Sequence, residues 1–281
     1  MGMSNVIEIN GLTKRYGKSR GVEDVSFSVE EGIIYGFLGP NGAGKSTTIR
    51  SMLGMLQYEK GTIHLFRKDT KRDLESILAE VGYMPSEAMF YPTMRVSEVI
   101  RLAADIRKKD CREEAKKLCD RLQVDTRKRI DELSLGNRKK VSIVCAMQHR
   151  PKLFVFDEPT SGLDPLMQTE FFELIKEYVT EGASCFLSTH VLSEVKKYCQ
   201  KVAIMKEGRL LFEDRVENMT KSATKHIRLV RNGVEEEFTF DGDLQQLFAG
   251  LVEQKVDDIL IEEPSLDEIF MQYYKIVSND L

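Results

Sequence analysis

The stretch Gly39-Pro40-Asn41-Gly42-Ala43-Gly44-Lys45-Ser46 decides the fold that this chain is expected to adopt. It fits the pattern GxxxxGK[ST] in full, with an apolar run at 33–38 before it and a helical pattern at 45–56 after it. Glycines let the backbone bend so that successive N–H groups point at phosphate oxygens. The following helix directs its positive N-terminal end at the same anion. We therefore predict a nucleotide-binding loop.

The side chains of this loop have distinct expected roles. Lys45 supplies a point charge to the β- and γ-phosphates, and the Ser46 hydroxyl is a ligand for Mg²⁺. A chance match to the pattern is expected in roughly one chain in a hundred of this length, and the strand–loop–helix context lowers that further. The motif indicates a nucleotide without naming the reaction. The expected nucleotide contacts are Gly39, Pro40, Asn41, Gly42, Ala43, Gly44, Lys45, Ser46 and Thr47.

A second site motif follows the apolar run at 153–156, which ends in Asp157 and Glu158. In an open parallel sheet, ligands bind beyond the carboxyl ends of the strands. Asp157 is therefore expected to hold Mg²⁺, directly or through water. Glu158 is the candidate general base that polarises the attacking water. The alternative is a strand end that merely carries two acidic residues.

The whole chain of 281 residues predicts an α/β protein with a parallel sheet, because strand and helix patterns alternate along it. We expect a first domain at 1–215, with a helical insertion at about 86–150, and a small α+β accessory domain at 216–281. Predicted strands lie at 6–9, 22–29, 33–38, 62–66, 81–84, 153–156, 185–187, 202–205, 227–230, 236–240 and 256–261. Predicted helices lie at 45–56, 74–81, 99–108, 113–122, 138–147, 166–179, 192–199, 243–251 and 266–274.

Composition narrows the possible partners. The net charge of −4 offers no electrostatic reason to bind nucleic acid, and the basic runs at 127–129 and 138–140 are expected to lie on solvated faces. The sequence has no apolar run near the roughly 20 residues that span a bilayer, so direct membrane insertion is not expected. Five cysteines without CxxC spacing are expected to be core residues in a reducing cytosol. No signal peptide is predicted.

Further motifs make the first 210 residues or so resemble the ABC ATPase family. Leu133-Ser134-Leu135-Gly136-Asn137 resembles the family signature LSGGQ, and Ser161-Gly162-Leu163-Asp164 resembles the D-loop. Ser188-Thr189-His190 resembles the H-loop, and 81–87 resembles the Q-loop. The resemblance implies a P-loop NTPase (RecA-like) sheet, an N-terminal antiparallel β subdomain, an inserted helical subdomain and ATP hydrolysis with Mg²⁺.

The same resemblance assigns residue roles. Tyr16 sits where the family places an aromatic ring that stacks on adenine. His190 follows the apolar run at 185–187, at the carboxyl edge of the sheet, where it can hydrogen-bond a γ-phosphate and the attacking water. A head-to-tail dimer is implied, in which Ser134 and Gly136 of one subunit close over the ATP of the other, with Asp164 also at the nucleotide.

Three positions depart from the family pattern. Leu135 replaces the first signature glycine, and Asn137 replaces the final glutamine. Ser86 stands where the Q-loop has a glutamine that reaches the metal. Because serine is shorter, either a water bridges Ser86 to Mg²⁺ or hydrolysis is slower, and Glu87 is an alternative substitute.

The segments 36–45 and 262–270 are similar to exporter ATPases with a short C-terminal extension. Members act with separately encoded ABC-2 type membrane subunits, so we expect a homodimer or heterodimer bound at the cytoplasmic face of the membrane. Two alternatives stay open. One is a soluble ABC machine that acts on DNA or the ribosome, although the chain lacks long coiled coils and a second cassette. The other is a degenerate cassette with little turnover. For 216–281 we hypothesise dimer stabilisation.

Overall fold

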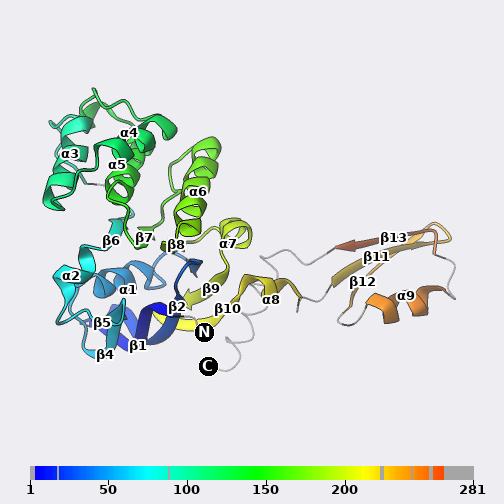
Figure 1. The fold of residues 1–281 in the computed structure, drawn as a ribbon. Helices are drawn as coiled ribbons and strands as arrows, with labels where there is room; N and C mark the ends of the chain where they lie inside the picture. Colours follow the sequence, from blue (N-terminus) through cyan, green and yellow to red (C-terminus); the bar gives the residue numbers. More distant parts are fainter. Residues whose placement is uncertain are drawn as a thin grey trace. The chain divides into compact units, whose positions relative to one another are not determined.

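The computed structural model describes residues 4–17, 19–87, 89–221, 225–240, 242, 244–252 and 256–262. Contacts divide the chain into two units, Met1–Glu213 and Asp214–Leu281. Figure 1 shows the elements of both. The division falls two residues before the boundary expected from the sequence.

A six-stranded sheet forms the centre of the first unit, and four of its strand pairs are parallel. The strands follow the order β10-β9-β3-β8-β7-β6. β7 and β8 are buried along their whole length, as strands covered on both faces should be. This confirms the predicted parallel α/β sheet. The bounds are β3 Ile34–Leu38, β6 Val81–Met84, β7 Leu153–Asp157, β8 Ser184–Thr189, β9 Lys201–Lys206 and β10 Arg209–Arg215.

An antiparallel sheet covers one face of this central sheet and confirms the expected N-terminal β subdomain. Its order is β2-β1-β4-β5. Phe27 of this sheet contacts Phe37 and Phe186 of the central sheet, with ring centroids 5.2 and 5.8 Å apart. Aromatic rings therefore fill the space between the sheets. The bounds are β1 Asn5–Tyr16, β2 Ser19–Glu30, β4 Lys60–Leu65 and β5 Lys68–Asp69.

Helices complete the layers of the first unit. Ile49 and Met52 of α1 (Lys45–Met52) belong to the core that the two sheets share. On the other face of the central sheet, Phe156 meets Phe171 of α6 (Pro165–Thr180), with centroids 5.2 Å apart. Tyr198 of α7 (Leu192–Tyr198) stacks on α6. A short helix, α2 (Leu74–Leu78), precedes β6.

The residues between β6 and β7 form the helical layer of the first unit (Figure 1). It comprises α3 (Val96–Ile106), α4 (Arg112–Arg121), η1 (Ile130–Glu132) and α5 (Leu135–Met147). The predicted insertion is therefore present. Within the described residues, none of the helices has the length and apolar character needed to cross a bilayer.

Two expectations about α5 were wrong. The helix begins at Leu135 instead of Arg138, because the Ser134 hydroxyl accepts a hydrogen bond from the Asn137 N–H and caps it. The basic run at 138–140 is not a solvated face, since Lys139 and Lys140 are only 3% and 8% exposed. The physical reason is that α5 contacts α3, α4 and β6, which leaves it little surface.

Smaller boundary errors have local causes. The helix predicted at 45–56 ends at Met52, and the chain turns at Gly54 with a φ of 70°. The helix predicted at 74–81 ends at Leu78. The strand predicted at 62–66 ends at Leu65, because Phe66 has a φ of 51° and begins a turn.

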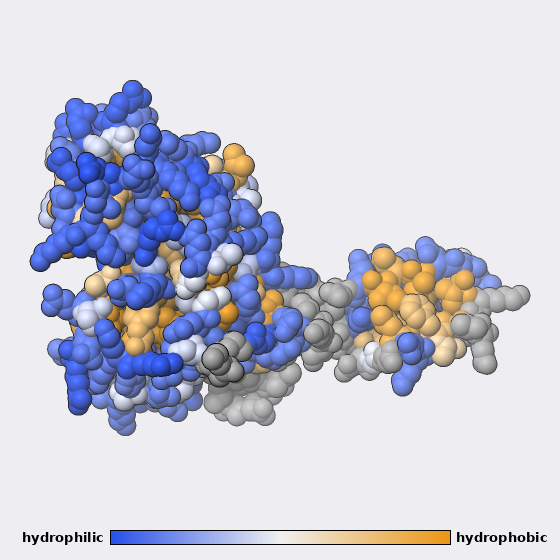
Figure 2. All heavy atoms as spheres, viewed as in Figure 1, coloured by the Kyte–Doolittle hydropathy of each residue, from blue (hydrophilic) through white to orange (hydrophobic). Residues whose placement is uncertain are grey.

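The second unit contains a three-stranded antiparallel sheet in the order β12-β11-β13 and a helix, α9. Ile227, Leu229 and Leu247 form its small core. Figure 2 shows apolar side chains gathered on the face of this unit that is turned to the viewer. The predicted helix at 266–274 lies outside the described residues. The bounds are α8 Val216–Lys221, β11 Lys225–Arg231, β12 Val234–Phe240, α9 Leu244–Val252 and β13 Asp258–Glu262.

Candidate nucleotide-binding site

The loop between β3 and α1 has the backbone geometry that its glycines predict. Gly42 and Gly44 have φ angles of 80° and 104°, in the left-handed region that other residues rarely adopt. Gly44 is also the N-cap of α1, so the N–H groups at the start of that helix face the end of the loop. At Gly39, a Cβ would lie 2.6 Å from the carbonyl oxygen of Met205.

Backbone hydrogen bonds fix the loop to the edge of the sheet. The Gly39 N–H donates to the Thr189 carbonyl at the end of β8, over 3.2 Å. The Gly208 N–H, in the turn between β9 and β10, donates to the Ala43 carbonyl over 3.0 Å. Because both ends of the loop are held, its amides are oriented before any phosphate arrives.

Lys45 is only 5% exposed and directs its ammonium into the loop. Its Nζ donates to the carbonyl oxygens of Gly39 and Pro40, at 2.7 and 3.2 Å. The same nitrogen lies 3.4 Å from Oε1 of Glu158. One cation is thus shared between the phosphate-binding loop and the acidic end of β7.

Ser188 organises the acidic end of β7, and sequence reasoning gave it no role. Its hydroxyl donates to Oδ1 of Asp157 over 2.5 Å and accepts from the Glu158 N–H over 3.1 Å. Asp157 and Ser188 are neighbours in the parallel pair of β7 and β8. The H-loop motif contains Ser188, but only the strand register reveals its partner.

Glu158 turns sharply out of the strand. Its φ of 51° is uncommon for a residue with a side chain, and such conformations persist where the surroundings enforce them. The turn brings Oε1 to 3.6 Å from Nδ1 of His190, whose side chain is half exposed. The three residues predicted as catalytic, Lys45, Glu158 and His190, therefore lie together.

The H-loop is held by its own residues. The Thr189 hydroxyl donates to Oε2 of Glu194 over 2.8 Å and accepts from the Val191 N–H over 2.9 Å. Thr189 is also the residue whose carbonyl receives the Gly39 N–H. The position of His190 is therefore linked to the position of the phosphate-binding loop.

The signature and the D-loop contact each other within the chain. A Cβ at Gly136 would lie 2.6 Å from the carbonyl oxygen of Gly162, so only glycine fits this approach. Asp164 caps α6 by accepting a hydrogen bond from the Met167 N–H over 3.0 Å. Ser134 and Asp164, both predicted to bind nucleotide, thus serve as helix caps in this structure. Leu135 is 67% exposed beside them.

Tyr16 lies at the end of β1, opposite Ser19 of β2, and is 43% exposed. The next part of β2 borders the phosphate-binding loop, since a Cβ at Gly44 would lie 2.6 Å from Cγ1 of Val22. The β1–β2 hairpin therefore borders this loop, and at its end Nζ of Lys14 lies 5.5 Å from the centre of the Tyr16 ring.

Ser86 follows β6, and its carbonyl oxygen accepts a hydrogen bond from Nζ of Lys139 over 2.8 Å. Burial lowers the pKa of Lys139, while the negative charges of Glu158, Asp157 and Glu87 act to raise it. Sequence reasoning missed this lysine because its basic neighbours suggested a solvated run.

The donor set at the end of β7 suits Mg²⁺. Oδ2 of Asp157 is buried and has no hydrogen-bond partner, although Oδ1 is bonded to Ser188. Within the described residues, three or more His, Cys, Asp or Glu side chains nowhere surround one point. Mg²⁺ does not need such a cage, because it is typically held by one or two carboxylates together with substrate phosphates and water.

Comparison with known proteins gives the family. The model of the ABC transporter family matches residues 22–161. The bacitracin transport ATP-binding protein BcrA of Bacillus licheniformis is 35% identical over 229 residues, which cover 80% of this chain and 74% of that protein. This chain belongs to the ABC transporter family. It is an ATP-binding and ATP-hydrolysing subunit of such a transporter.

Other members of the ABC transporter family match over more of the chain. The uncharacterized ABC transporter ATP-binding protein MJ1023 of Methanocaldococcus jannaschii is 29% identical, covering 96% of this chain and 99% of its own. A solved ATP-binding subunit of an ABC transporter matches with a TM-score of 0.76 and 26% identity, covering 96% of this chain and 99% of that one. Both matches include the region after the cassette.

Proposed function

We propose that this ABC transporter subunit powers export through a separately encoded ABC-2 type permease, bound at the cytoplasmic face of the membrane. The observation that carries the proposal is the position of Glu158, whose carboxylate lies between Lys45 and His190 and next to Asp157. An exporter role is supported by the likeness of 36–45 and 262–270 to such ATPases. The bacitracin transport relative supports a role in transport.

Nucleotide binding uses the loop and its neighbours. The backbone amides at 39–47 surround the phosphates, and Lys45 exchanges its carbonyl partners for phosphate oxygens. The exposed ring of Tyr16 stacks on adenine. Ser46 and Asp157 would hold Mg²⁺, with Ser86 reaching it through water, and the bound ion would neutralise phosphate charge.

Hydrolysis then depends on Glu158. Its carboxylate accepts a hydrogen bond from the attacking water and orients it in line with the γ-phosphate. Lys45 and His190 stabilise the negative charge that develops on the transferred group. Because Lys45 and Glu158 are already 3.4 Å apart, binding of the phosphates frees the carboxylate for the water.

Two subunits share the two nucleotides. Ser134 and Gly136 of one subunit close over the ATP of the other, and Asp164 approaches it from the D-loop. The exposed Leu135 then lies at the interface. Loss of the γ-phosphate removes negative charge between positive sites, so the dimer opens and the helical layer passes the motion to the permease. The partner is either a second copy or a related subunit, and residues 216–281 stabilise the pair.

The test is the substitution Glu158→Gln. We expect ATP affinity to stay unchanged, phosphate release to fall by about 100-fold or more, and an ATP-dependent dimer to accumulate on size-exclusion chromatography. Glu173→Gln is the control, because Glu173 is an exposed residue of α6 that pairs with Lys176. Unchanged phosphate release in E158Q would remove Glu158 from the mechanism.

Two further measurements test the remaining parts. Lys45→Ala should weaken ATP binding in titration calorimetry, and equal affinity would contradict the loop assignment. Co-purification of the full chain from a membrane extract should yield a multi-span permease. A wild-type protein that binds ATP without releasing phosphate would instead support the degenerate cassette, which the departures at Ser86 and Leu135 favour.

A further inference from the structure

Lys139 is a buried cation that the mechanism above does not use. It lies one turn into α5, and its side chain is 3% exposed. Lysine is rarely buried this deeply unless its ammonium has partners, because loss of hydration is costly. Its Nζ donates to the carbonyl oxygen of Ser86 in the Q-loop over 2.8 Å.

The strand register places this contact beside the catalytic carboxylates. Met84 pairs with Phe156 in the parallel pair of β6 and β7. Ser86 and Glu158 each follow two residues later, so both leave the sheet at the same edge. The charges of Glu158 and Asp157 oppose the effect of burial on the pKa of Lys139, which agrees with this proximity.

The position of α5 against β6 is fixed sterically. A Cβ at Gly82 would lie 2.2 Å from the carbonyl oxygen of Ala146 in α5. The helix and the strand are therefore in direct backbone contact, and α5 cannot approach further. Lys139 spans from this fixed helix to the Q-loop.

The first two turns of α5 thus carry two functions. Ser134 and Gly136 are the residues that close over the partner's ATP in the proposed function. Lys139 lies three residues after Gly136, on the same short piece of helix, and binds the Q-loop of its own subunit. Because no residue intervenes, the position of this piece of helix sets the position of the Ser86 carbonyl.

We propose that Lys139 is a positioning residue that couples the two ATP sites of the dimer. ATP on the partner fixes the start of α5, Lys139 then holds the Q-loop, and the Q-loop completes the surroundings of Glu158 in the same subunit. Hydrolysis at one site therefore requires ATP at the other. This inference rests on the proposed function.

The test compares Lys139→Met, Lys139→Arg and Lys140→Met in the full chain. Lys140 is the matched control, because it is the adjacent lysine of α5 and is also buried, at 8% exposed. Within the described residues, Lys140 makes no hydrogen bond or ion pair with the Q-loop. Steady-state phosphate release is measured against ATP concentration, and ATP affinity is measured separately with a fluorescent ATP analogue.

For K139M we expect an ATP affinity within about two-fold of wild type and a kcat about 10-fold lower. A change of about 10-fold is typical of the coupling between two binding sites. The Hill coefficient should fall to about one. Arginine keeps the charge and can still reach the Ser86 carbonyl, so K139R should recover most of kcat and the cooperativity. K140M should resemble wild type in both.

Each of the following outcomes would overturn the inference. K139M could turn over ATP with wild-type kcat and Hill coefficient, or K140M could lose as much as K139M, which would assign the effect to burial of a lysine in α5. A protein without Glu158-dependent turnover would remove the proposed function and this inference together. Turnover that depends on Glu158 but not on Lys139 would remove this inference alone.

Discussion

Two of the attachments between the helical layer and the rest of its unit differ in kind. The first, the α5–β6 seam, consists of Lys139, Ala146 and His149 against Ser86, Gly82 and Val81. Nε2 of His149 lies 3.3 Å from the Val81 carbonyl at the far end from Lys139. The seam is buried and includes a direct backbone contact between Gly82 and Ala146.

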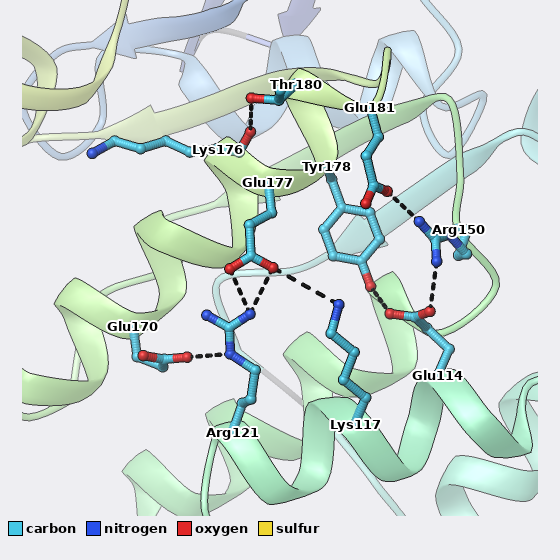
Figure 3. Close-up of polar contacts among 10 residues, drawn as sticks. All are labelled: Glu114, Lys117, Arg121, Arg150, Glu170, Lys176, Glu177, Tyr178, Thr180 and Glu181. Carbon is cyan, nitrogen blue, oxygen red and sulfur yellow. Dashed lines mark hydrogen bonds and ion pairs between the residues drawn. The ribbon is translucent and has the colours of Figure 1, made fainter.

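The second attachment is the α4–α6 charge cluster, shown in Figure 3. Arg121 of α4 binds Glu170 and Glu177 of α6, with Nε 2.5 Å from Oε1 of Glu170. Arg150 binds Glu114 and Glu181. Further members are Lys117, which pairs with Glu177, and Tyr178, whose hydroxyl donates to Glu114.

The difference shows what each attachment can contribute. Steric contact at the seam acts over tenths of an ångström and is insensitive to salt. Charge pairs at the cluster act over longer distances, but solvent and salt weaken them. A helical layer attached in this way can tilt about the seam. The ion pairs of the cluster then separate, while the contact between α5 and β6 is kept. The seam therefore fixes where the helical layer lies on the central sheet, and the cluster determines how freely the layer tilts.

The substitution Gly82→Ala should have the largest effect on the stability of the seam. The added methyl group would lie 2.2 Å from the Ala146 carbonyl and 2.7 Å from Cγ of Pro151. Because a backbone and a proline ring cannot move aside easily, we expect a loss of about 3 kcal/mol in the free energy of unfolding, measured by urea denaturation. Gly250→Ala is the control, since its methyl group meets no atom of the described residues within 4 Å. A G82A midpoint equal to wild type would show that α5 is not fixed on β6.

Gly82 also marks the limit of sequence-based prediction. The phosphate-binding loop, the acidic strand end and the parallel α/β sheet could be predicted, because each depends on local pattern and chain direction. The contact of Gly82 with Ala146 could not, since it depends on the distance between elements 64 residues apart. The burial of Lys139 and the bond of Ser188 to Asp157 fall in the same class. Local composition even favoured the opposite conclusion for Lys139.

His149 offers a second way to test the seam. Burial, with the charge of Arg107 as a further cause, lowers the pKa of His149 to about 4. The unfolded chain titrates near 6.5, so between pH 6.5 and 4 it binds a proton that the folded chain does not. Stability should therefore be complete above pH 6.5 and fall by roughly 2 to 3 kcal/mol as the pH drops to 4.

The measurement is the free energy of unfolding in urea across pH 4 to 7.5. His149→Gln keeps an amide donor for the Val81 carbonyl and cannot titrate. The difference in stability between wild type and H149Q should shrink as the pH falls, in favour of the variant. If the free energies of unfolding of wild type and H149Q change in parallel with pH, His149 is hydrated and the seam is open at this end.

The smallest effect is expected at the charge cluster, from Arg121→Met. The variant keeps the apolar stem of the side chain and removes both ion pairs, so it should lose about 1 kcal/mol or less in 50 mM salt. At 0.5 M salt the difference from wild type should shrink, because the pairs are partly exposed and therefore screened. Arg112→Met is the control, since Arg112 is 89% exposed and pairs with nearby Asp110 on the same exposed surface. The free energy of unfolding of R121M could instead fall as far as that of G82A, or fall by an amount that does not change with salt. Either result would mean that the cluster fixes the helical layer as firmly as the seam does.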